Sequence, residues 1–96
     1  MSKSQFFSPF TSRNFEREIL NRFRNLAVIL PSECQISRET WNQNTVLCLN
    51  FEHCPNHIEI IKEDVSMLSS IVKKLSLANS IIFRQGNQLK AWRKCS

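Results

Sequence analysis

The sequence is poor in glycine, proline and aspartate, and it has no long apolar run. One Gly and three Pro in 96 residues exclude a glycine-rich phosphate loop and a low-complexity linker. The single aspartate, Asp64, gives little support to hydrolysis by a pair of carboxylates. No apolar segment approaches the ~18 residues that read as a membrane-spanning helix. With 42% hydrophobic residues, we expect a single folded domain.

Cysteines are too few and too irregularly spaced for a disulfide scaffold. There are four in the chain, whereas disulfide-rich domains contain more than ~8–10% cysteine. Residues 1–9 also lack the apolar core of a secretory signal. We therefore expect reduced thiols and a cytoplasmic location.

Charge is unevenly distributed along the chain, which has a net charge of +5. Residues 1–25 have an excess of basic side chains, and residues 26–64 have an excess of acidic ones. Residues 65–96 contain six Lys and Arg and no carboxylate. Such a segment attracts phosphate, anionic lipid or an acidic protein surface, unless the acidic middle of the chain neutralises it in the fold.

The first half of the chain predicts one helix. Residues 1–11 mix Phe with Ser and Pro and are expected to form a flexible arm. Residues 12–26 place apolar side chains on one helical stripe. Residues 26–30 can end that helix or begin a buried strand, and the Val-Ile pair favours the strand. Residues 31–44 are polar and aperiodic, which predicts a loop that contains Trp41.

The second half predicts two hairpins and a second helix. Residues 45–52 alternate, and residues 57–61 are expected to return beside them as an antiparallel strand. Residues 64–75 show the spacing of an amphipathic helix that Asp64 caps. Residues 80–85 and 88–93 flank Gly86-Asn87, which is the signature of a two-residue hairpin turn.

A turn of this kind fixes the register of the last hairpin. It predicts that Arg84 pairs with Leu89, Phe83 with Lys90 and Ile81 with Trp92. The fold class expected from all these elements is α+β. Two helices would pack on one face of a small, mostly antiparallel sheet of four to five strands built from two hairpins.

A cluster of cysteine and histidine is a weak candidate for a metal site. It consists of Cys48, His53, Cys54 and His57, but these spacings match neither of the usual zinc-ligand pairs. The alternative is a small buried thiol followed by turn residues. The same residues give no clear nucleophile with an oriented base. We predict no metal, no cofactor, no catalytic residue and no enzymatic activity.

The basic and aromatic residues predict a binding function. We expect a small accessory or regulatory protein that binds a protein partner, because aromatic residues and Arg anchor interfaces. The alternative is binding of RNA or DNA, with aromatic side chains of the last hairpin stacking on bases. The sequence leaves the oligomeric state open. The residues predicted to contact the partner are Arg13, Arg17, Arg24, Arg84, Lys90, Trp92 and Arg93.

Overall fold

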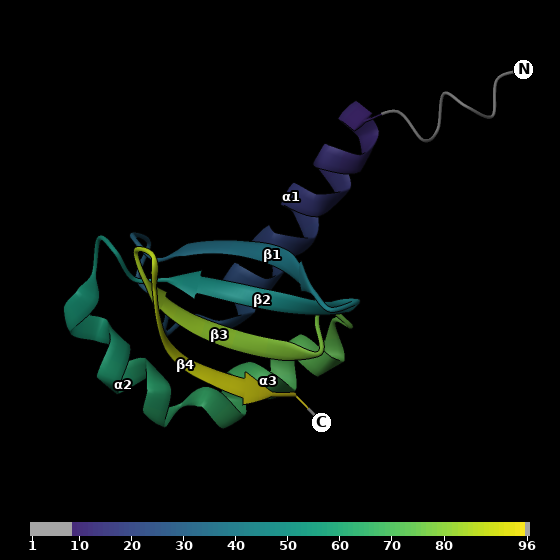
Figure 1. Cartoon of the computed structure of the whole chain (residues 1–96). Coiled ribbons are helices and arrows are strands. Elements are labelled where there is room, and N and C mark those ends of the chain that lie inside the picture. Colours follow the sequence, from purple (N-terminus) through teal and green to yellow (C-terminus); the bar gives the residue numbers. More distant parts are fainter. Residues whose placement is uncertain (1–8, 96) are drawn as a thin grey trace, which may run out of the picture.

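The computed structural model describes residues 9–95 of the chain, with side chains described from residue 14 onward. Within these residues the structure has three α-helices, one 3-10 turn and four strands (Figure 1). Their bounds are α1 Pro9–Leu26, β1 Gln35–Trp41, β2 Asn44–Asn50, η2 Pro55–His57, α2 Ile58–Glu63, α3 Val65–Lys74, β3 Ser80–Gln85 and β4 Gln88–Lys94.

The four strands form one sheet in the order β1-β2-β3-β4. Two antiparallel hairpins, β1-β2 and β3-β4, meet where β2 pairs with β3 in parallel. A parallel pair needs a long crossover connection, and residues 51–79, which contain α2 and α3, provide it. This is an α+β fold with a mostly antiparallel sheet, as predicted, although it has three helices rather than two.

The main core lies between the helices and one face of the sheet. Leu47, Leu49, Ile81 and Phe83 point into it from the two central strands. The ring of Phe83 stacks on Phe51 with a centroid distance of 5.8 Å. The helices contribute Phe23, Ile58, Ile61, Val65, Leu68 and Val72. All three helices therefore cover the same face, and no described helix covers the other (Figure 1).

The predicted strand at residues 57–61 is wrong, because this segment is helical. Pro55 occupies the first turn of η2, where its missing N–H costs nothing. Ile58 and Ile61 are buried, whereas Ile60 is 61% exposed. The apolar period is thus helical, and the alternation of Ile58 and Ile60 suggested a strand that does not form.

The loop predicted at residues 31–44 is also wrong, since it contains β1. Of its positions on the helix face, Ile36 is apolar, but Arg38 and Thr40 are polar, which hides the alternation. Arg38 points to the helix face and donates to Glu16 of α1 and, at 3.0 Å, to the backbone oxygen of Leu77. The turn to β2 uses Asn42 and Gln43, both with positive φ, in place of the usual glycine.

The boundaries of α1 differ from those predicted. The helix begins at Pro9 instead of residue 12, so the predicted arm at 1–11 overlaps it, and residues 1–8 lie outside the described residues. The strand favoured at residues 26–30 is absent, because α1 ends at Leu26 and turns follow it. Ala27 and Leu30 reach the core from these turns.

The register of the last hairpin is partly wrong. Gly86 has a φ of 62° and forms the turn, and Arg84 pairs with Leu89 as predicted. Beyond that pair a β-bulge shifts the strands by one residue, so that Phe83 pairs with Ala91. Ile82, rather than Ile81, therefore lies opposite Trp92. Because side chains alternate between the faces, this shift moves Trp92 from the helix face to the open face.

Candidate protein-binding surface around strand β4

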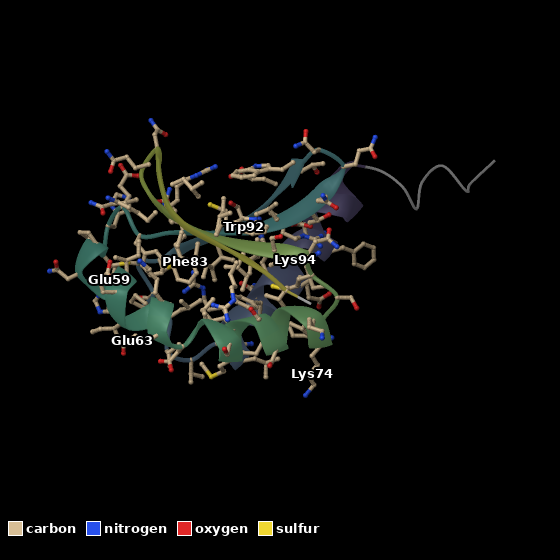
Figure 2. All side chains as sticks on the ribbon, turned by 60° about the horizontal axis from the view of Figure 1, so that its bottom comes forward. Glu59, Glu63, Lys74, Phe83, Trp92 and Lys94 are labelled. Carbon is tan, nitrogen blue, oxygen red and sulfur yellow. The ribbon has the colours of Figure 1, made fainter. Side chains whose placement is uncertain are left out.

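The open face of the sheet has a small apolar centre. Val46, Cys48 and Ile82 are at most 2% exposed, and Trp41 packs against them. Trp92 lies beside this centre, opposite Ile82, and is 54% exposed. Phe83 lies in the core on the helix side, so Phe83 and Trp92 belong to different faces (Figure 2). An indole ring that is half exposed, on a sheet face that no described helix covers, is available to a partner.

An ion pair crosses this face above the central strands. Arg84 on β3 donates two hydrogen bonds to the Glu39 carboxylate on β1, with N···O distances of 2.7 and 3.1 Å. The Trp41 indole N–H donates to the same carboxylate at 2.9 Å. Hydrogen bonds from Arg84 and then Trp41 lower the pKa of Glu39. The charge of Arg84 is therefore satisfied within the chain and holds Glu39 in place.

Strand β4 is an edge of the sheet. In the described part of the chain it pairs only with β3. Six of its seven residues are exposed, including Lys90 and Leu89. Lys90 is the extra residue at the bulge, since Ala91 and Leu89 pair on either side of it. Lysines and bulges are common on edge strands, because they discourage uncontrolled pairing.

A basic groove separates β4 from α3. It is a surface cavity of about 310 Å³ whose described lining contains three hydroxyls, three cations and no carboxylate. Ser69 also accepts a weak hydrogen bond from the Cys95 thiol at 3.7 Å, which links α3 to the end of β4. Its lining residues are Ser66, Ser69, Ser70, Lys73, Arg93 and Lys94.

The predicted contact residues fall into two groups, one on β3 and β4 and the other on α1. Arg84, Lys90, Trp92 and Arg93 lie on β3 and β4. The α1 group lies toward the β1 edge, where Arg17 and Arg24 line a cavity with Ile36. The side chain of Arg13 lies outside those that the structure describes.

Arg24 has a role within the fold. It donates hydrogen bonds to the backbone oxygens of Pro31, at 3.2 Å, and Cys34. These bonds fix the segment that leads from α1 into β1. Together with Arg84, Arg24 is a predicted contact residue whose guanidinium is already engaged by its own chain.

The cysteine and histidine candidates are not brought together around one point. Cys48 lies on the open face, whereas Cys54 is buried in the core on the helix side. His53 and His57 are exposed. In the described part of the chain no three His, Cys, Asp or Glu residues are grouped as metal ligands would be.

The buried thiols are poor nucleophiles. Burial raises the pKa of Cys34 to about 12 and also raises the pKa values of Cys48 and Cys54. At neutral pH these three side chains are protonated thiols, and the thiolate is the reactive form.

The groove is a feature that the sequence reasoning missed. Neither Lys73 nor the three serines are among the contact residues that the sequence predicts, and a lysine in the last turn of a helix is already favoured by the helix dipole. A signal was nevertheless present, because Ser66, Ser69, Ser70 and Lys73 recur at the spacing of one helical stripe.

Among the described residues, no helix is long and apolar enough to span a bilayer.

Comparison with known proteins adds no family to this description. No protein-family model, no curated protein and no solved structure matches the chain.

Proposed function

We propose that this chain is a small, non-enzymatic accessory protein that binds a protein partner through β4 and the adjacent open face of the sheet. The exposure of Trp92 is the observation that carries the proposal. Aromatic side chains with a half-buried ring anchor protein interfaces, because they bury a large apolar area with little loss of conformational entropy. Leu89, 53% exposed on the same strand, extends the apolar area.

The charges on this face favour a protein over a nucleic acid. A strand of RNA or DNA needs cations that are free to meet its phosphates. Arg84 is already paired with Glu39, and the carboxylate of Glu39 would repel a phosphate. A protein surface can instead offer both polar and apolar groups to such a mixed face.

The non-enzymatic part of the proposal is supported by the cysteines. Cys34, Cys48 and Cys54 are buried, and their raised pKa values keep them protonated at neutral pH. Cys48 and Cys54 also lie on different faces of the sheet.

An affinity-capture experiment tests the proposal. The wild-type chain and two variants, Trp92→Ala and Val28→Ala, are used as baits in an extract of the native cells. Val28 is a matched control, because it is apolar and 79% exposed but lies far along the chain from β4.

We expect a protein that the wild-type and Val28→Ala baits recover and that the Trp92→Ala bait loses. The identified protein is then titrated against the purified chain. Equal recovery by all three baits would contradict the proposal. Loss of the captured material after nuclease treatment would favour the nucleic-acid alternative instead.

A further inference from the structure

The groove between α3 and the edge of β4 has the properties of a site for an extended acidic peptide. We infer that the protein partner inserts an acidic segment here, as an added strand beside β4. This inference rests on the proposed function and names the chemistry of the partner. Its evidence is independent of Trp92, because it comes from the opposite side of β4.

The first observation is the composition of the groove. Lys73, Arg93 and Lys94 meet there without a carboxylate in the described lining. None of the three forms an ion pair within the described residues, in contrast to Arg38, Lys62 and Arg84. Three cations that repel one another in a single cavity favour an anionic ligand.

The second observation is the free edge of β4. An edge strand presents unpaired N–H and C=O groups, to which an extended peptide can add by main-chain hydrogen bonds. The exposed residues of β4 leave this edge accessible, and the groove lies beside Arg93 and Lys94, in the regular part of the strand after the bulge. A helix beside such an edge, as α3 is here (Figure 1), forms the second wall of a groove.

The dimensions of the groove match those of a strand. Ser66 and Lys73 are seven residues apart on α3, which corresponds to about 10.5 Å along the helix axis. In an extended peptide, the side chains that point the same way are about 6.6 Å apart. Two acidic side chains of the added strand can therefore lie along the groove, where the serine hydroxyls donate to their carboxylates.

The experiment uses two synthetic peptides of eight residues, one of alternating Thr and Glu and one of alternating Thr and Gln. Binding to the full chain is followed by fluorescence anisotropy, and amide NMR locates the site. We expect the acidic peptide to bind, to shift amides of both β4 and α3, and to bind more weakly at higher salt. The neutral peptide should not bind at about 1 mM, because it lacks the charges.

A pair of charge-reversal variants tests the groove itself. Lys73→Glu combined with Arg93→Glu should weaken binding of the acidic peptide at least about tenfold, since each exposed ion pair contributes a factor of a few. The matched control is Arg22→Glu combined with Lys74→Glu, which makes the same change in net charge outside the groove. Figure 2 shows that Lys74 points away from the sheet. Melting curves verify that both variants are folded.

Four outcomes would overturn the inference. The first two are no binding of the acidic peptide at about 1 mM and equal binding of the neutral peptide. The third is undiminished binding of an acidic peptide whose alternate amides are methylated. The fourth is tighter binding of an eight-nucleotide oligothymidine than of the acidic peptide. The failure of this inference is also separable from the failure of the proposed function. A partner lost by the Trp92→Ala bait but recovered by the groove variant would leave the proposed function standing without the acidic segment.

Discussion

Phe83 and Trp92 lie on the two strands of one hairpin and show how its aromatic side chains can have different roles. Phe83 is 1% exposed and stacks on Phe51, whereas Trp92 is 54% exposed. The two rings lie on opposite faces because the bulge at Lys90 shifts the register. The first ring stabilises the fold, and the second is available for binding.

Replacing these two rings by alanine should therefore have unequal effects on stability. We expect Phe83→Ala to lower the free energy of unfolding by about 3–5 kcal/mol, because it opens a cavity in the core. Trp92→Ala should lower it by less than about 1 kcal/mol, since half of the ring is already in water. Urea unfolding measures both. A loss of several kcal/mol in Trp92→Ala would show that the ring is structural.

Two glutamates predict how stability depends on pH. Hydrogen bonds from Arg38 and Arg84 lower the pKa values of Glu16 and Glu39, respectively. A glutamate whose pKa is lower in the folded state stabilises the fold at pH values above its unfolded pKa of about 4.3. This stabilisation is lost as the pH falls through the pKa of the folded state.

The melting temperature of the wild-type chain should therefore fall as the pH decreases below about 5. The variant Glu16→Gln, Glu39→Gln should start from a lower melting temperature at pH 7 and fall less. Scanning calorimetry between pH 7 and pH 3 provides the comparison. Parallel curves for the two proteins would show that neither ion pair contributes to stability.

At the scale of the elements, the two hairpin turns use different residues for the same backbone geometry. Gly86 has a φ of 62°, and a Cβ added there would meet only Glu52, at 3.9 Å. Gln43, in the β1-β2 turn, has a φ of 69° without being a glycine. Positive φ costs an ordinary residue about 1 kcal/mol or more relative to glycine.

Opposite substitutions at the two turns should therefore change the free energy of unfolding in opposite directions. Gly86→Ala should destabilise the chain by about 1 kcal/mol through backbone strain alone, and Gln43→Gly should stabilise it by up to a similar amount. Chemical denaturation of the two variants against wild type tests this. A change of the same sign in the free energy of unfolding of both variants would mean that side-chain contacts outweigh the conformational preference of the backbone.

These turns also show why part of the fold was predictable and part was not. Gly86-Asn87 is a local signal, and the hairpin and the α+β class follow from it and from the apolar stripe of residues 64–75. Strand β1 was missed because its inward position Arg38 is balanced by Glu16, which is 22 residues away in the sequence. The residues next to Arg38 in the sequence therefore do not indicate that it has such a partner.

The candidate site was predictable to a similar extent. The cations and Trp92 indicate β4 as a candidate site in the sequence. The faces on which these side chains lie depend on a β-bulge, for which the sequence has no local signal. The engagement of Arg24 by the Pro31 and Cys34 oxygens likewise depends on how the chain returns after α1. The groove needs α3 and β4 side by side, which only the tertiary structure provides.

At the scale of the whole molecule, the fold separates its main core from the proposed binding surface. The three helices cover one face of the sheet, and no helix of residues 9–95 covers the other face. Of the cations in residues 65–96, Arg84 is neutralised by Glu39 of the acidic middle of the chain. The cations at the groove are not, because its described lining contains no carboxylate. The proposed interface is the region where the open face, the edge and this groove meet.

Photo-crosslinking in the native cells tests this claim most directly. A photoreactive amino acid such as benzoylphenylalanine replaces Trp92 in one variant and Val28 in the other. We predict a discrete protein adduct from position 92 and none from position 28. No protein adduct from position 92, or the same adducts from both positions, would contradict the assignment of β4 as a protein-binding surface.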